Sequence, residues 1–94
     1  TGWYVFGTKS ELKGQRILDG DRVLQGAFNK SYFTKIDIRI TKEIKLYSKS
    51  ARLLTAHPSS SYSLSADTNG QYVLRITDPQ TFWSTSKYLV IQVK

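Results

Sequence analysis

The chain has 94 residues and a formal net charge of +7, and it contains neither cysteine nor methionine. A chain of this length forms a single domain, 1–94, with one hydrophobic core, and the missing cysteines exclude disulfides and thiolate metal sites. No apolar run approaches the roughly 18 residues of a membrane-spanning helix.

The N-terminal segment predicts a strand followed by a short helix. Trp3–Phe6 consists of four strand-forming apolar residues, which favours a strand near the centre of the sheet. Thr8 and Glu11 have the spacing of a capping box, so we expect a helix over residues 9–13. Gly14 should end this helix.

The next segment predicts little regular structure. Ile17 and Leu18 are typical of a short edge strand, and residues 19–21 read Asp-Gly-Asp, which favours a turn. Residues 22–28 are ambiguous, and we expect an irregular loop with one short extended piece.

The clearest strand signal is Phe33–Thr41, FTKIDIRIT. Apolar and polar side chains alternate strictly here, which predicts one buried and one solvated face. The expected core residues are Ile36, Ile38 and Ile40. The expected solvated residues are Lys35, Asp37, Arg39 and Thr41. Residues 43–47 continue the alternation, with Ile44 and Leu46 pointing inward.

Three further strands are expected in the second half of the chain. Ala51–Thr55 is a short apolar run. Tyr62–Ala66 and Tyr72–Ile76 should form a hairpin, because the Asn-Gly pair at 69–70 is a strong signal for a type I′ turn.

The C-terminal segment predicts a capped helix and a buried strand. Asp78 is a good N-cap and Pro79 a good first helical residue, so Phe82 and Trp83 should lie on a short helix. Tyr88–Val93 is apolar on both faces, which indicates a strand covered on both sides.

Together these elements predict an α+β, mostly β fold. We expect one twisted antiparallel sheet of about 6–7 short strands with two short helices. The sheet is either open or curled into a partial barrel.

Catalysis and metal binding have weak support in this sequence. The one histidine, His57, precedes Pro58 in a turn, and the nearby serines and acids form no specific catalytic set. No metal-ligand spacing and no phosphate-binding glycine loop is visible. We therefore expect a non-enzymatic protein with no catalytic residues, no metal and no cofactor.

Basic and aromatic side chains are the better candidates for ligand binding. Residues 30–52 are rich in Lys and Arg, which favours weak, salt-sensitive binding of polyanions. Tyrosines and a tryptophan among polar residues are expected to be partly exposed and available for contacts. The candidate ligand-binding residues are Tyr32, Lys35, Arg39, Lys45, Tyr47 and Trp83.

Four segments carry a family resemblance: YVFGTKSELK (Tyr4–Lys13), FNKSYFTKIDIR (Phe28–Arg39), LLTAHPSSSY (Leu53–Tyr62) and ITDPQTFWSTSKYLVIQVK (Ile76–Lys94). In their order they resemble the C-terminal domain of a family of Bacteroidetes envelope proteins. The chain departs from the family pattern around Gln15–Gln25, where the family often has a glycine-rich, more apolar stretch. The resemblance implies an upstream lipoprotein-type signal and a coiled-coil stretch, so we expect the 94 residues to be the C-terminal part of a longer protein.

The resemblance also implies a function. Some family members are described as collagen-binding glycoprotein adhesins and many only as hypothetical proteins. We therefore expect an adhesin-like binding module of a cell-envelope lipoprotein. Its partner would be an extracellular-matrix protein or glycan, and an upstream lipid anchor would be its only link to the membrane.

Two alternatives remain open at this point. The domain could be a structural cap of a coiled-coil stalk with no ligand of its own. It could also be a small basic barrel that binds nucleic acid, which an exposed aromatic pair in a basic groove would favour. The sequence leaves the oligomeric state open.

Overall fold

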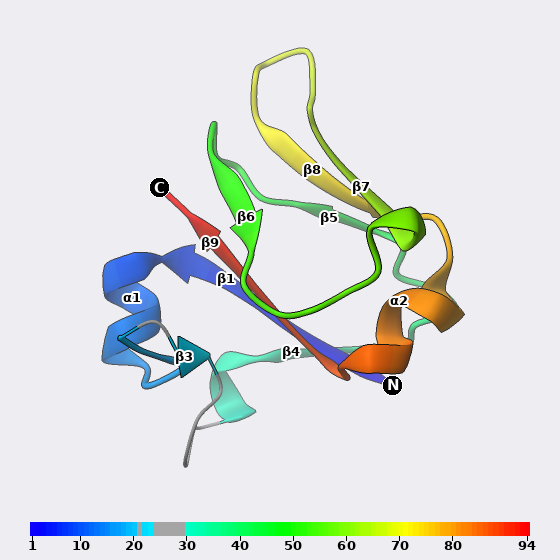
Figure 1. The fold of residues 1–94 in the computed structure, drawn as a ribbon. Helices are drawn as coiled ribbons and strands as arrows, with labels where there is room; N and C mark the ends of the chain where they lie inside the picture. The colour runs from blue at the N-terminus through cyan, green and yellow to red at the C-terminus, as the bar shows by residue number, and fades with distance from the viewer. Residues whose placement is uncertain (21, 24–29) are drawn as a thin grey trace.

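The computed structural model describes residues 1–20, 22–23 and 30–94 (Figure 1). These residues form nine strands, two α-helices and two short 3-10 helices. In chain order the elements are β1 (Gly2–Thr8), α1 (Lys9–Gly14), β2 (Leu18–Asp19), β3 (Arg22–Val23), η1 (Lys30–Tyr32), β4 (Thr34–Ile36), β5 (Glu43–Lys45), β6 (Ala51–Leu53), η2 (Ser59–Ser61), β7 (Tyr62–Ala66), β8 (Tyr72–Ile76), α2 (Pro79–Thr85) and β9 (Tyr88–Val93). The predicted α+β, mostly β class is confirmed.

The strands form three sheets, whereas one antiparallel sheet was expected. A four-stranded sheet has the order β4-β1-β9-β6, a three-stranded sheet the order β5-β8-β7, and β2 and β3 form a small ribbon. β1 and β9 pair in parallel, with Trp3 opposite Tyr88 and Thr8 opposite Val93. β1 therefore lies inside its sheet, as predicted. The sequence could not predict that β1 pairs with β9, because no local signal connects the first and the last strand of the chain.

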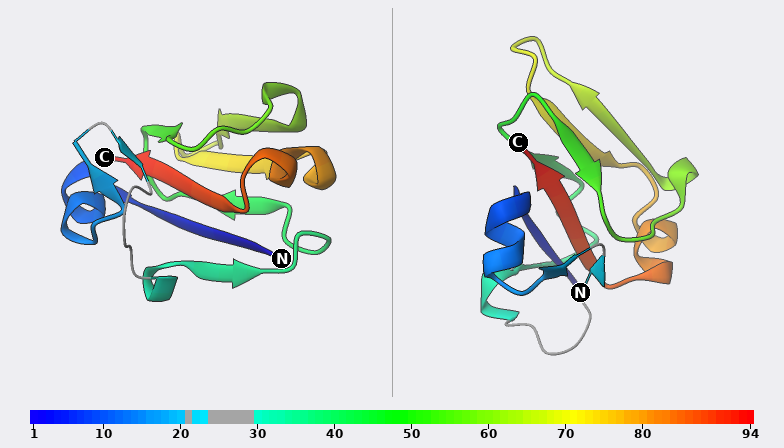
Figure 2. Two further views of the ribbon diagram at one scale, coloured as in Figure 1. Left: turned by 60° about the horizontal axis from the view of Figure 1, so that its bottom comes forward. Right: turned by 60° about the vertical axis from the view of Figure 1, so that its left-hand side comes forward.

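β9 separates two hydrophobic clusters, so its predicted burial on both faces is confirmed. Leu89, Ile91 and Val93 belong to the large core cluster, between the two larger sheets and α2. Val90 belongs to the small core cluster, which α1 and the β2–β3 ribbon cover. The large core cluster contains Ile44, Leu46, Leu74, Ile76, Phe82, Trp83, Leu89, Ile91 and Val93. The small core cluster contains Val5, Leu12, Ile17, Leu18, Phe33 and Val90. Figure 2 shows the resulting layers, with the two sheets stacked and α1 beside the β1–β9 pair.

Helix α1 begins with the predicted capping box. The Thr8 hydroxyl accepts a hydrogen bond from the Glu11 amide at 3.2 Å, and the Thr8 amide donates to the Glu11 carboxylate at 2.8 Å. The bond from the Thr8 amide is the main reason why the pKa of Glu11 is lowered. The helix includes Gly14, and the residue with left-handed backbone is Arg16, at φ 61°. Gly14 is therefore not the helix stop that was expected.

The segment after α1 forms the expected short edge strand, β2, over Leu18–Asp19. In the described part of the chain it pairs with β3 alone and joins neither large sheet. Gly20 has a φ of 62°, which agrees with the predicted turn. The rest of the predicted 22–28 loop after Val23, and Asp21 of the turn, lie outside the described residues.

The prediction of a long strand over Phe33–Thr41 is wrong. β4 covers only Thr34–Ile36, and the chain then turns. Ile40 is 77% exposed, while Ile36 and Ile38 are half-buried against the large core cluster. The cause is Asp37, whose backbone carbonyl accepts bonds from the amides of Ile40 and Thr41, both at 3.0 Å. A local turn therefore replaces the sheet ladder. The inward positions of β5 and its continuation, Ile44 and Leu46, are confirmed.

The β7–β8 hairpin forms between the two predicted strands, with Ala66 opposite Tyr72 and with a different turn. A type I′ turn needs positive φ at both central residues, and only Gly70 has one, at 79°. The Asp67 carboxylate instead accepts bonds from the amides of Asn69 at 2.8 Å and Gln71 at 3.0 Å. Gly70 also donates to the Asp67 carbonyl at 3.0 Å. The aspartate thus selects a longer loop that needs left-handed backbone only at the glycine.

Helix α2 is capped as predicted. The Asp78 carboxylate accepts a bond from the Thr81 amide at 3.3 Å, and Pro79 opens the helix. Phe82 and Trp83 are both fully buried and close one end of the large core cluster. The helix therefore fixes the end of the molecule next to the turn between β4 and β5 (Figure 1).

Candidate functional site

The turn between β4 and β5 is held in shape by one aspartate–arginine pair. The Asp37 carboxylate accepts bonds from the Arg39 amide at 2.9 Å, from Arg39 Nε at 3.1 Å and from Arg39 Nη2 at 3.0 Å. The Arg39 side-chain bond is the main reason why the pKa of Asp37 falls to about 2. The pair therefore stays ionised at neutral pH and adds to the backbone bonds that the Asp37 carbonyl accepts in this turn.

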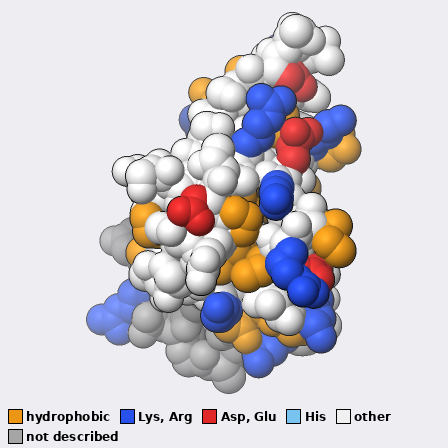
Figure 3. Space-filling model, turned by 90° about the vertical axis from the view of Figure 1, so that its right-hand side faces the viewer, with side chains coloured by type: hydrophobic (Ala, Val, Ile, Leu, Met, Phe, Trp, Pro, Cys, Tyr) orange, Lys and Arg blue, Asp and Glu red, His pale blue; other side chains and the backbone are white. Residues whose placement is uncertain are grey.

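This turn presents apolar and basic side chains together. Ile40 is the most exposed large hydrophobic side chain in the described part of the protein, at 77%. We define the basic–apolar turn surface by five residues: Lys35, Ile38, Arg39, Ile40 and Lys42. Figure 3 views the molecule from the side of α2, where Lys and Arg side chains lie among hydrophobic ones.

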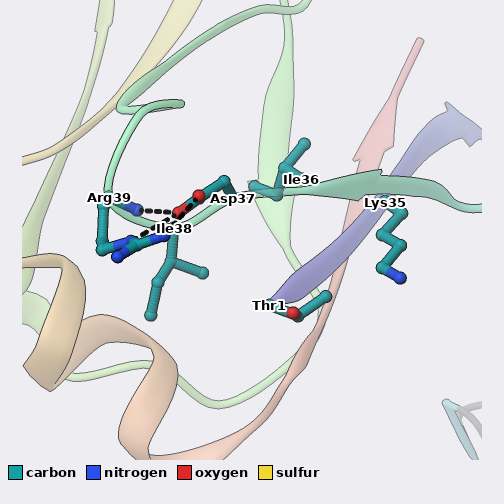
Figure 4. A pocket seen from close by; sticks show the side chains of 6 residues that line it. All are labelled: Thr1, Lys35, Ile36, Asp37, Ile38 and Arg39. Carbon is teal, nitrogen blue, oxygen red and sulfur yellow. Dashed lines mark hydrogen bonds and ion pairs between the residues drawn. The ribbon is translucent and has the colours of Figure 1, made fainter.

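Two hollows flank the basic–apolar turn surface, and Ile38 and Arg39 line both of them. The first has a volume of about 500 Å³ and is lined by Thr1, Lys35, Ile36, Asp37, Ile38 and Arg39. Figure 4 shows Arg39 on one side of this hollow and Lys35 on the other. The second, of about 510 Å³, is lined by Ile38, Arg39, Lys42, Asp78, Pro79 and Gln80. The turn therefore stands between two depressions that a partner surface could fill.

The structure brings together only some of the predicted binding residues. Lys35 and Arg39 line the same hollow. Lys45 lies on β5 opposite Val73, and Tyr47 follows it with a left-handed backbone at φ 53° and 70% exposure. Tyr32 belongs to η1 and is 47% exposed. None of these last three residues lines either hollow.

The expected partial exposure of Trp83 is wrong, because its side chain is fully buried. Its ring lies against the Cα of Gly2, in a space that a Cβ on that glycine would enter. It also contacts Phe82 edge-on, at a centroid distance of 5.1 Å. The neighbouring serines and threonines suggested an exposed position for Trp83. Its side chain instead lies on the face of α2 that packs against the core. Trp83 therefore cannot contact a ligand in this fold.

Ile38 and Ile40 are the site residues that sequence reasoning missed. Both were predicted for the core, because the alternation was extended past Asp37. An available signal was Asp37 itself, since aspartate is depleted in strands and readily bonds the backbone two residues ahead.

A second cluster combines aromatic rings with lysines. Trp3 and Tyr88 stack across the β1–β9 pair at 6.4 Å. Lys35 Nζ lies 5.7 Å from the centre of the Trp3 ring, and Lys30 Nζ lies 5.6 Å from that of Tyr88. The rings are half-buried, and each has a lysine over it. An incoming base would have to displace these cations before it could stack.

The side chain of His57 packs against helix α2 and makes two hydrogen bonds within the protein. Its ring stacks on Phe82 at 4.1 Å, with Nδ1 2.8 Å from the Phe82 carbonyl and Nε2 2.8 Å from the Thr55 hydroxyl. A carbonyl only accepts, so Nδ1 carries the proton and the hydroxyl donates to Nε2. Burial lowers the pKa of His57 and favours this neutral form. Both nitrogens therefore take part in packing a loop onto α2.

The described residues contain neither a cluster of potential metal ligands nor a membrane-spanning helix. No group of three or more His, Cys, Asp or Glu side chains there is arranged to hold a metal ion. None of the helices in residues 1–20, 22–23 and 30–94 combines the length and apolar character needed to cross a membrane.

No model of a known protein family, no curated protein and no solved structure matches this chain.

Proposed function

We propose that this domain is a non-enzymatic binding module that engages a protein partner through the basic–apolar turn surface. The observation that carries this proposal is the 77% exposure of Ile40 on a turn that Asp37 and Arg39 hold in one conformation. A large aliphatic side chain exposed in a fixed position is a typical anchor for a partner pocket.

The charges around Ile40 indicate the chemistry of the partner. Lys35 and Lys42 are exposed, whereas the charges of Asp37 and Arg39 compensate each other, so the surface carries a net positive charge. A partner with an apolar pocket rimmed by carboxylates would complement this arrangement. Because the turn is already ordered, binding would cost little conformational entropy.

We also propose that the domain belongs to a bacterial cell-envelope lipoprotein with an adhesin-like role. This part rests on the family resemblance of the four segments described above, and collagen is the ligand that the resemblance suggests. The stalk-cap function is the alternative if the domain has no ligand. The nucleic-acid alternative has less support, because the stacked rings of Trp3 and Tyr88 are half-buried rather than exposed.

Titration of the domain against collagen, heparin and single-stranded DNA at low and high salt tests the proposal. We expect collagen binding that persists at high salt and that Ile40→Ser weakens by tenfold or more, because the apolar anchor is lost. The matched control is Tyr47→Ala, which removes another exposed side chain outside the turn. Binding to heparin and DNA only, lost with salt and unchanged in Ile40→Ser, would contradict it.

A further inference from the structure

The outer edge of β7 presents a row of backbone groups beside which no strand of the described residues lies. Within residues 1–20, 22–23 and 30–94, β7 pairs only with β8. The Ser61 carbonyl accepts from the Thr77 amide, and the Asp67 amide donates to the Gln71 carbonyl, so the odd-numbered positions of β7 bond to β8. The N–H and C=O groups of Tyr62, Leu64 and Ala66 therefore point away from the sheet. Figures 1 and 2 show no described element on that side of β7.

The other edges of the two large sheets are protected in a way that β7 is not. β4, β5 and β6 are each three residues long, and each carries a cation: Lys35, Lys45 and Arg52. Short length and charge are the usual means of preventing edge-to-edge pairing. β7 is five residues long, Tyr-Ser-Leu-Ser-Ala, with no charge and no proline.

The sequence of β7 is also nearly the same in both directions around Leu64. In an antiparallel pair centred there, Leu64 lies opposite Leu64 of the second copy, and Tyr62 lies opposite Ala66. These are the residues whose backbone groups point outward, so the pairing would use every one of them. On the solvent face Ser63 would lie opposite Ser65, which brings no like charges together.

We propose that two copies of this chain associate along β7 and join their three-stranded sheets into one continuous sheet. A self-complementary edge fits a second copy through a two-fold axis, and this is the commonest symmetry of homo-oligomers. The five-residue contact makes this a weak, concentration-dependent dimer. The proposal is independent of the partner that the basic–apolar turn surface binds.

Sedimentation velocity over a concentration series, up to the millimolar range, tests the association. We expect a monomer–dimer equilibrium for the natural chain and monomers only for Ala66→Pro. The proline removes the outward N–H of residue 66 and leaves the hydrogen bonds between β7 and β8 intact. The far-UV circular dichroism spectrum of the variant should therefore match that of the natural chain. The control Ala66→Val keeps the N–H and should still dimerise. A natural chain that stays monomeric throughout, or an Ala66→Pro dimer, would overturn the proposal.

Cysteine cross-linking tests the register, since the chain has no natural cysteine. Ser63→Cys chains mixed with Ser65→Cys chains should form disulfide-linked pairs faster than either variant alone, because these two positions face each other. Faster cross-linking of each variant with itself would overturn the antiparallel pairing centred on Leu64.

Discussion

His57 ties the loop before β7 to helix α2 through Nδ1, which bonds the Phe82 carbonyl, while Nε2 bonds Thr55 within the loop. Burial is the main reason why its pKa lies below the ordinary value of 6.5. The unfolded chain therefore binds a proton more readily than the folded one. The stabilising contribution of His57 is complete above about pH 6.5, and it is lost as the pH falls through the lower folded-state pKa.

Urea unfolding at a series of pH values between 5 and 8 checks this. We expect His57→Leu to be less stable by about 1–3 kcal/mol at neutral pH, because the Phe82 carbonyl and the Thr55 hydroxyl lose their partner. The variant should also lose most of the pH dependence in this range. An unchanged pH profile would mean that another group titrates.

Gly2 is required by its close contact with Trp83. A Cβ at this position would lie 3.0 Å from three carbon atoms of the buried indole ring. Gly2→Ala should therefore lower the free energy of unfolding by about 1–3 kcal/mol, since the ring has no space to move. Gly14→Ala is the control, because a Cβ there meets no atom of the described residues within 4 Å and alanine favours the helix. Thermal denaturation of both variants measures the difference, and equal melting temperatures would contradict the close contact.

At the scale of elements, α2 depends on its N-terminal cap. The Asp78 carboxylate accepts bonds from the Thr81 amide at 3.3 Å and the Thr81 hydroxyl at 2.7 Å. Asp78→Ala should lower the stability by about 1 kcal/mol in urea unfolding. Gln80→Ala changes an exposed residue of the same helix and should have little effect. A loss as large in Gln80→Ala would mean that the cap is not the cause.

The elements that could be predicted are those with local signals. The capping box of α1, the Asp78-Pro79 start of α2 and the β7–β8 hairpin all lie within a few residues of the structure that they specify. β4 was predicted too long because Asp37 competes for backbone hydrogen bonds, which alternation alone cannot show. The partition into three sheets depends on contacts between distant segments, and no single segment encodes those.

The sequence also predicted only part of the candidate site. Charge density pointed to Lys35 and Arg39, and both line one hollow. The exposure of Ile40 depends on a turn that sequence alternation concealed, while the burial of Trp83 depends on which face of α2 meets the sheet.

At the scale of the whole molecule, β9 links two hydrophobic clusters that share one strand. Trp83 belongs to the large core cluster, and Trp3 packs against the small one. A shared strand should make the clusters unfold together, as in most domains of this size. In Trp3→Phe the remaining tryptophan reports on the large core cluster, and in Trp83→Phe on the small one. We expect the fluorescence and circular dichroism transitions to coincide in each variant. Separate midpoints would mean that the clusters unfold independently.

The parallel pairing of β1 with β9 has a mechanical consequence. Residue 1 precedes β1 at one end of this pair, and residue 94 follows β9 at the opposite end (Figure 1). A pulling force between these two residues would slide the strands past each other and load all the hydrogen bonds of the ladder at once. A force applied between residue 70, in the turn before β8, and residue 94 would instead open contacts one after another. Single-molecule stretching should therefore need a higher force between residues 1 and 94 than between residues 70 and 94. Tension applied to the two ends of the chain is then resisted by the whole β1–β9 ladder.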